Sequence, residues 1–410
     1  MLGSCFVLMA ALSLDSAGKL ALGQASAYQQ ALDEERIAAL DVTQARAALL
    51  PKIRNLSTVT YNKPLTAHSS DPAFIAQNGT REYQSLVGAE GSLDFGLHAA
   101  IRRSHELLAA AHAGTELARR ELLRSLRELY FGYALGSAKR RSAEESLAAA
   151  EEFERVTSLQ QEAGEVPEVD LIRARLQTAQ RRDDLEQARV QETIAAAGLR
   201  ALVGYQPSDA LEVLELTAAP SESDIEVLKP AAMRPEIVQA EAQQRAARAE
   251  AGVARAEWLP SLTYSADEGF DSPSLRHDEI RQHSGYLLTA NLRIPIFDWG
   301  AARAKQRQAE LRAESAGHQL ALTRRQVEQQ YLQAHEGALS AVRRAANARA
   351  ALADAQRNAD ISVARYRAGE AQIVEVTDAL TTLAQQRVNL QQALFDFEVA
   401  RGQLQEAAGQ

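Results

Sequence analysis

The sequence contains a single cysteine, few aromatic residues and no long apolar run. Cys5 is the only cysteine among 410 residues, which excludes a disulfide within the chain and any metal site built from several cysteines. Aromatic residues make up 5% of the chain. No stretch of about 20 apolar residues occurs, so no transmembrane helix is predicted. Membrane strands stay possible, because a strand crosses a bilayer with only about 10 residues of alternating polarity.

The charge pattern and the lack of catalytic motifs argue against further classes of protein. The net charge is −9 with acidic and basic residues interspersed, whereas a nucleic-acid-binding protein usually has a basic face or tail. No glycine-rich phosphate loop, Ser-His-Asp order or zinc spacing occurs, so we predict no enzyme activity, no cofactor and no metal. His98, His105 and His112 recur every seven residues, but about 10 Å separates successive members on a helix, too far to share one ion.

The strongest positive signal is an internal repeat. Residues 163–199 align without a gap on residues 368–404, with 13 of 37 positions identical, and both copies begin with Ala-Gly-Glu. The later copy has an apolar residue at every seventh position: Val376, Leu383, Leu390, Phe397 and Leu404. A heptad repeat of this length predicts helices that pack lengthwise on other helices.

The same order of elements is predicted twice. In residues 12–203 we expect a helix over 14–49, strands over 51–62 and 81–95 with a loop between them, a long helix over 97–162 and a helix over 168–203. In residues 236–404 we expect a helix, strands over 260–267 and 284–297, a long helix over 300–368 and a helix over 372–404. Residues 204–235 contain four prolines and form a mixed linker, and residues 405–410 form a tail.

The predicted strands alternate between apolar and polar residues. Over 284–297, Tyr286, Leu288 and Leu292 share one face, and Thr289 and Asn291 share the other. Four such strands cannot close a membrane barrel alone, because the smallest barrels have about eight. We therefore expect several chains to contribute strands, and three copies would give twelve.

Residues 1–11 are interpreted as the end of a secretory signal. The apolar run that begins at Phe6 is typical of a signal core, although no Lys or Arg precedes it. The stretch from Leu2 to Cys5 is superficially similar to a lipoprotein acylation site. An ordinary buried first helix is the alternative interpretation.

Taken in order, these segments resemble the trimeric outer-membrane efflux channels typified by TolC. The resemblance covers nearly all of residues 12–404. It rests on the two Leu-Pro strand entries, the Asp-Phe-Gly and Asp-Trp-Gly strand exits, the Arg-Pro-Glu at residues 234–236 and the two Ala-Gly-Glu turns. It implies a homotrimer in the lipid of the bacterial outer membrane. That trimer would have a twelve-stranded transmembrane β-barrel and an α-barrel of antiparallel helix pairs in the periplasm, with residues 204–235 in an equatorial belt.

The resemblance also implies a function and partners. The function is that of the exit duct of a tripartite efflux or type I secretion system. The partners are a periplasmic adaptor protein and an inner-membrane pump of RND, ABC or MFS type, without nucleic acid.

Site residues follow from the resemblance, at the helical turns. Glu375 and Asp378 match the acidic periplasmic gate and, being three residues apart, share a helix face. Tyr366 and Asp170 match the pair that locks the closed tip, and Ala371 replaces a basic residue that some members use in the same lock. The turns where the adaptor docks match Ala163, Gly164, Ala368 and Gly369.

Two other classes stay open at this point. A soluble coiled-coil scaffold would explain the heptads but would not explain the four segments of alternating polarity. An enzyme has no support beyond the unassigned residues 204–235. Without the resemblance, Glu375 and Asp378 are more simply a solvated helix face, and Tyr366 is an ordinary packing residue.

Overall fold

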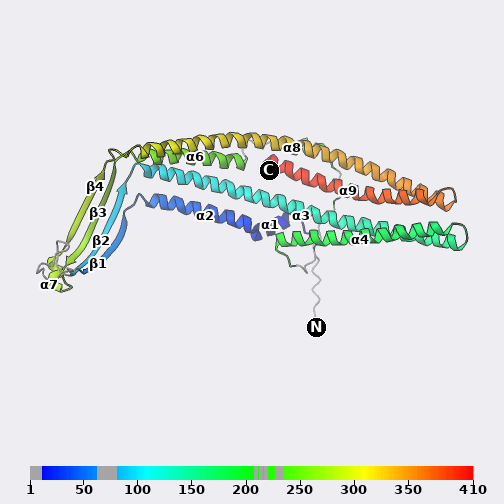
Figure 1. Cartoon of the computed structure of the whole chain (residues 1–410), viewed down its shortest axis with the longest axis horizontal. Coiled ribbons are helices and arrows are strands. Elements are labelled where there is room, and N and C mark those ends of the chain that lie inside the picture. The colour runs from blue at the N-terminus through cyan, green and yellow to red at the C-terminus, as the bar shows by residue number, and fades with distance from the viewer. Residues whose placement is uncertain are drawn as a thin grey trace. The chain divides into compact units, whose positions relative to one another are not determined.

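The structure is a computed structural model that describes residues 12–61, 81–206, 211, 216, 220–226 and 234–409. It is mostly helical and contains one four-stranded antiparallel sheet (Figure 1). The chain divides into two units: unit 1 comprises Met1–Leu32, Gly114–Glu236 and Arg324–Gln410, and unit 2 comprises Asp33–Ala113 and Ile237–Thr323. The expected signal segment at residues 1–11 and most of the expected linker lie outside the described residues.

Two long helix pairs make up most of unit 1, which contains α3 from Gly114 onward and α8 from Arg324 onward. The long helix α3 (Gly96–Glu162) turns into α4 (Glu168–Val203), and α8 (Ala301–Arg367) turns into α9 (Ile373–Ala407) (Figure 1). The short helix α5 (Ser223–Glu226) lies in the expected linker. One helix expected over residues 14–49 is instead two, α1 (Leu14–Gln24) and α2 (Ser26–Ala47), because Ala25 has an extended backbone with φ −69° and ψ 113°.

The predicted heptad row of α9 lies in the core of unit 1. Val376 and Leu404 are fully buried, Phe397 and Leu383 nearly so, and Leu390 is partly buried. Leu394 packs with Ala345 of α8 and Leu135 of α3. Lengthwise packing of helix on helix is therefore confirmed, and it joins the two helix pairs through small and aliphatic side chains.

The sheet belongs to unit 2. Its strands lie in the order β1 (Lys52–Tyr61), β2 (Arg81–Leu93), β3 (Ser261–Ser272) and β4 (Ser284–Arg293), each antiparallel to the next. β3 runs five residues beyond its expected end, because Ser272 still pairs with Tyr83 of β2. β4 ends before residue 297, where Pro295 has no N–H to donate to a ladder. The segment between β3 and β4, expected to be a loop, contains the helix α7 (His277–Gln282).

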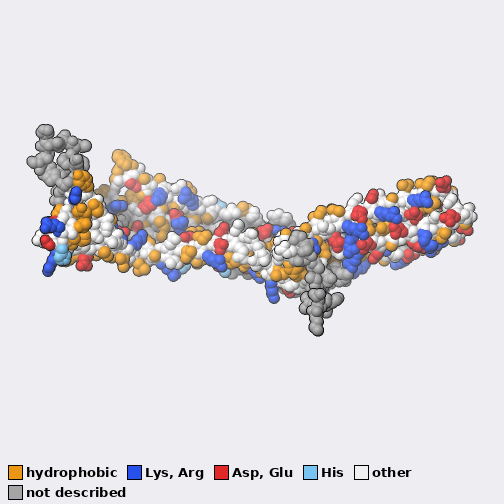
Figure 2. All heavy atoms as spheres, turned by 90° about the horizontal axis from the view of Figure 1, so that it is seen from below, with side chains coloured by type: hydrophobic (Ala, Val, Ile, Leu, Met, Phe, Trp, Pro, Cys, Tyr) orange, Lys and Arg blue, Asp and Glu red, His pale blue; other side chains and the backbone are white. Residues whose placement is uncertain are grey.

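The strand register gives the sheet one apolar and one polar face. Leu262 of β3 lies opposite both Leu93 of β2 and Leu292 of β4, so apolar side chains align across the strands. Hydrophobic side chains gather over the strands in Figure 2, while charges of both signs are interspersed over the helices. The large exposed members of the apolar face are Ile53, Val59, Tyr61, Val87, Leu93, Tyr286, Leu288 and Leu292. An exposed apolar surface of this kind marks an interaction with membrane or protein.

Ion pairs join two helices of unit 2. Helix α6 (Pro235–Ala256) is tied to α3 by ion pairs, Arg103 to Glu250 at 3.0 Å and Arg245 to Glu106 at 2.7 Å. In the part of the chain that the structure describes, no helix is both long and apolar enough to cross a membrane.

Two members of the histidine stripe of α3 contact side chains of α2. His105 Nε2 lies 2.9 Å from the Arg46 guanidinium, and His112 Nδ1 lies 2.9 Å from Glu35 Oε1. Among the described residues, no group of three or more metal-ligating side chains comes together.

Candidate gate at the helical turns

The two Ala-Gly-Glu sequences form turns with the same hydrogen bonds. After α3, the N–H of Glu165 donates to Gln160 O at 2.9 Å, and the N–H of Gly164 donates to Gln161 O at 3.0 Å. After α8, Glu370 and Gly369 repeat both bonds to residues 365 and 366. Gly164 and Gly369 have φ of +76° and +75°, a left-handed conformation that favours glycine at this position of a helix end. Ala163 and Gly164 are exposed, as are Ala368 and Gly369.

Helix α9 presents its two acids on the side away from the core. Ile373, Val376 and Ala379 are buried, and Glu375 and Asp378 between them are exposed. The spacing of three therefore places both carboxylates on one solvent-facing side of the helix, close to its N-terminus.

The two carboxylates have different partners. Glu375 Oε2 lies 3.2 Å from the Arg365 guanidinium, which also donates to the Glu370 carbonyl at 3.2 Å. Glu375 Oε1 accepts a long hydrogen bond of 3.5 Å from the N–H of Gln372. Within the described residues, Asp378 has neither an ion pair nor a side-chain hydrogen bond. Asp378 is thus the uncompensated charge of the two.

Tyr366 and Asp170 meet between the two helix pairs. The Tyr366 hydroxyl donates to Asp170 Oδ2 at 3.5 Å, and the tyrosine ring lies 5.4 Å from that of Phe153. Tyr366 is 5% exposed. Burial, followed by the nearby Asp170 charge, raises the pKa of the Tyr366 hydroxyl. The hydroxyl therefore stays protonated and able to donate at neutral pH.

Sequence reasoning missed several neighbours of this contact. Thr157 is fully buried and donates to Phe153 O at 2.9 Å. Ala371 packs against the same cluster and carries no charge. Arg365 and Arg367 are the basic residues in the last turn of α8, and Arg365 is the one that pairs with Glu375. Arg365 and Glu375 are ten residues apart across a turn, and no periodic pattern signals that pairing.

A second polar arrangement lies on the polar face of the sheet. Arg54 of β1 contacts Glu90 at 2.9 Å and Asp267 at 3.7 Å. Gly88 of β2 lies between Arg54 and Asp267 in the register, and a Cβ there would come within 2.0 Å of Asp267 Oδ1. Asp267 is only 8% exposed. The missing side chain at Gly88 allows this ion pair to bridge three strands.

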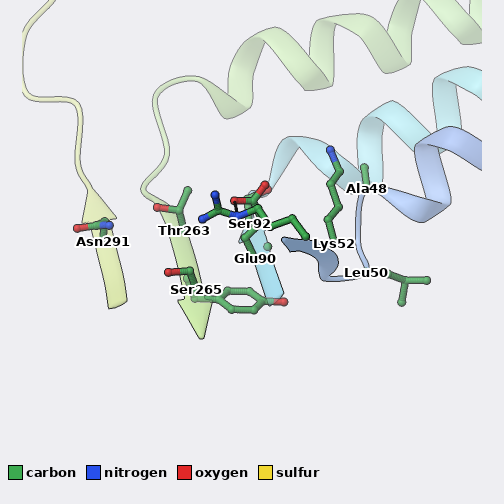
Figure 3. Close-up of a pocket in the computed structure, with 11 residues that line it drawn as sticks. Ala48, Leu50, Lys52, Glu90, Ser92, Thr263, Ser265 and Asn291 are labelled. Carbon is green, nitrogen blue, oxygen red and sulfur yellow. Dashed lines mark ion pairs between the residues drawn. The ribbon is translucent and has the colours of Figure 1, made fainter. Parts of the chain in front are cut away.

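A pocket of about 400 Å³ opens beside this ion pair. Figure 3 shows Thr263 and Ser265 of β3 and Asn291 of β4 on one side, with Lys52 on the other. The lining is rich in hydroxyl, amide and charged groups, which suits contact with water or ions.

Comparison with known proteins places the chain in a family. A sequence profile described as outer membrane efflux protein matches residues 14–205 and 230–410, which include both helical turns and the sheet. The chain belongs to the outer membrane efflux protein family.

Named relatives in this family are identical to the chain at about a quarter of the aligned positions. The toluene efflux pump outer membrane protein TtgC of Pseudomonas putida is 27% identical over 285 residues, which are 66% of this chain and 58% of that protein. The chain thus spans less than two thirds of the length of TtgC. The pyoverdine export outer membrane protein OpmQ of Pseudomonas aeruginosa is 28% identical over 387 residues, 90% of this chain and 79% of its own length.

Solved structures show the same fold. The Campylobacter jejuni CmeC outer membrane channel matches with a TM-score of 0.82 at 20% identity, covering 97% of this chain and 85% of CmeC. The outer membrane protein VceC of Vibrio cholerae matches with a TM-score of 0.83 at 19% identity, covering 97% and 96% of the two chains. The predicted fold of long helix pairs with four strands is confirmed by these likenesses.

Proposed function

We propose that this chain forms, with two further copies, the outer-membrane exit channel of an efflux system. The observation that supports the proposal is a sheet with one polar face, one apolar face and two open edges. The same chain contains two long helix pairs and belongs to the outer membrane efflux protein family. The polar face would line water, and the apolar face would meet lipid.

The open edges support assembly from several copies. Within the described residues, β1 and β4 each pair along one side only. An edge inside a bilayer must find a partner, because no water is present to satisfy its backbone groups. Two copies would supply eight strands, and the interior of an eight-stranded closed sheet is filled by side chains. Three copies supply twelve, which leaves room for a conduit.

The helical turns would form the gate of the proposed conduit. Glu375 and Asp378 from three copies would give a ring of carboxylates that favours cations. The contact between Tyr366 and Asp170 would hold the closed state. The exposed turns at Gly164 and Gly369 would contact a periplasmic adaptor, which delivers substrate from an inner-membrane pump.

Disulfide crosslinking tests the assembly. In a Cys5→Ser background, Ser57→Cys on β1 is combined in turn with Leu288→Cys, Ala290→Cys and Leu292→Cys on β4. Two strands separate β1 from β4 within one chain, so a disulfide between them joins two copies. We expect covalent dimers and trimers on denaturing gels, and a mass in detergent of three times the 44.6 kDa of one chain.

The matched control places both thiols within one chain. Ser57 and Ser85 are register partners whose hydroxyl oxygens lie 3.1 Å apart, so Ser57→Cys with Ser85→Cys should link without forming a ladder. A monomeric mass together with no ladder for any β1–β4 pair would refute the assembly.

A further inference from the structure

A groove of about 700 Å³ lies in unit 2 where the strands give way to helices. Its walls come from the end of β2, the end of α6 and the segment that joins β4 to α8. Apolar side chains form much of the lining: Phe95, Ala256, Trp258, Leu259 and Phe297. Two guanidiniums, of Arg255 and Arg303, line it as well.

Two aromatic side chains are exposed at one side of the groove. Phe297, which lines the groove, is 71% exposed. Trp299, which lies next to the lining, is 90% exposed, and the centres of the two rings are 4.9 Å apart. Trp299 has a φ of +56°, the only positive φ outside glycine among the described residues. A bulky residue adopts that conformation only where its surroundings impose it. A strained turn that exposes a tryptophan points to a ligand that covers the ring.

The charges at the groove are not neutralised. In the described part of the chain, Arg255 and Arg303 form no ion pair, whereas the nearby Lys305 pairs with Glu257. Glu310 feels the charge of Arg255 but is held by hydrogen bonds from Gln306 and Arg307, which lower its pKa.

The one acid in the lining is already engaged by backbone. Asp298 accepts from the N–H groups of Gly300 at 3.0 Å and Ala302 at 2.6 Å, at the start of α8. The groove therefore presents two cations beside an aromatic wall, without a competing free carboxylate among its lining residues.

We propose that this groove binds a glycerophospholipid of the periplasmic leaflet, with its phosphate at Arg255 and Arg303. Guanidinium groups match the geometry and charge of a phosphate, and tryptophan is enriched where bilayer meets water. An acyl chain would then follow Phe297 toward the exposed apolar face of the sheet. The proposal rests on the proposed function, since that function places the sheet in the membrane.

The tryptophans provide the probe. The chain has two tryptophans, Trp258 in the groove lining and Trp299 next to Phe297. Phosphatidylglycerol with bromine on one acyl chain should therefore quench the intrinsic fluorescence of the detergent-solubilised assembly when it occupies the groove. Brominated diacylglycerol, which lacks the phosphate, should quench only at concentrations at least about tenfold higher.

Charge-matched variants localise the site. Arg255→Gln with Arg303→Gln should shift half-maximal quenching by phosphatidylglycerol at least about tenfold higher. The control, Arg248→Gln with Arg312→Gln, removes two charges from the same two helices and should leave the curve in place. If the Arg255→Gln, Arg303→Gln variant fails to assemble, the two brominated lipids can still be compared on the unsubstituted protein, and that comparison tests whether the phosphate is recognised.

Two outcomes would overturn the lipid site. Equal quenching by both lipids in all three proteins would show apolar contact without headgroup recognition. Absence of quenching in the assembled protein would show that a second copy covers the groove. Conductance of the same preparations in planar bilayers separates these outcomes from a failure of the proposed channel function, because a channel without this site would still conduct.

Discussion

The Tyr366 hydroxyl donates to Asp170 Oδ2 at 3.5 Å and thereby joins the second helix pair to the first. The internal repeat relates Asp170 to Glu375, yet the two acids have different partners. Asp170 contacts the buried tyrosine, whereas Glu375 forms an exposed ion pair with Arg365. Equivalent positions of the two repeats thus have different roles. Asp170 contacts the other helix pair, whereas Glu375 is a charged residue exposed to solvent.

Loss of the tyrosine hydroxyl should favour the open state. One hydrogen bond contributes about 0.5–1.5 kcal/mol, so Tyr366→Phe should raise the open fraction by up to about tenfold. Asp170→Asn should act in the same direction but less, because the amide oxygen still accepts. Single-channel recordings in planar bilayers measure the open probability.

The control removes a hydroxyl elsewhere in unit 1. The Tyr133 hydroxyl donates to Leu211 O at 2.8 Å, away from the turns, so Tyr133→Phe should leave opening unchanged. The proposed lock would be refuted if Tyr133→Phe raised the open probability as much as Tyr366→Phe, or if Tyr366→Phe left the open probability unchanged.

The two carboxylates of the proposed gate should contribute unequally to cation selectivity. Asp378→Asn should lower the cation-to-anion permeability ratio roughly several-fold, because no other described residue compensates that charge. Glu375→Gln should lower it less, and Arg365→Gln should raise it by unmasking Glu375. Reversal potentials in a salt gradient report the ratio, with Asp360→Asn on α8 as control. If Asp378→Asn behaves like the control, these acids are ordinary solvated helix residues.

The apolar face of the sheet should reject charge. Leu288 and Leu292 are 70% and 63% exposed, and arginine at either should cost about 2–4 kcal/mol near the bilayer midplane. Thr289→Arg and Asn291→Arg on the polar face should be milder. The yield of heat-modifiable assembled protein measures the difference, and equal losses on both faces would mean that the faces are misassigned.

The glycine under the Arg54–Asp267 ion pair should resist substitution. Gly88→Ala places a Cβ within 2.0 Å of Asp267 Oδ1 and 2.8 Å of Ala266 O, so overpacking should cost about 1–3 kcal/mol. At Gly285 of β4 a Cβ would meet nothing within 4 Å, which makes Gly285→Ala the matched control. Thermal unfolding in detergent compares the two, and equal midpoints would show that the space at Gly88 is unimportant.

Periodicity predicted the parts of the fold where one pattern runs without interruption. The heptads from Val376 to Leu404 and the alternation from Tyr286 to Leu292 both lie as predicted. The sequence did not predict the end of β3, because Glu268 interrupts the alternation of apolar and polar residues. The strand continues beyond Glu268 because it pairs with β2. The helix break at Ala25 has no glycine or proline at that position to signal it.

Contacts between distant residues could not be predicted from pattern. Tyr366 and Asp170 are 196 residues apart, and only the family resemblance suggested their pairing. Likewise, the Arg365–Glu375 ion pair depends on the path of a turn. The bridging role of Gly88 depends on a register that two strands far apart in sequence fix together.

Accessibility of single cysteines during conductance tests the central claim most directly, that the polar face of the sheet lines a water-filled channel. In a Cys5→Ser background, Thr289→Cys and Leu288→Cys place a thiol on adjacent residues of β4 that face opposite sides. We predict stepwise conductance from both proteins in planar bilayers, with a charged water-soluble thiol reagent altering the current through Thr289→Cys alone. No conductance from either protein, or equal modification of both thiols, would contradict the account.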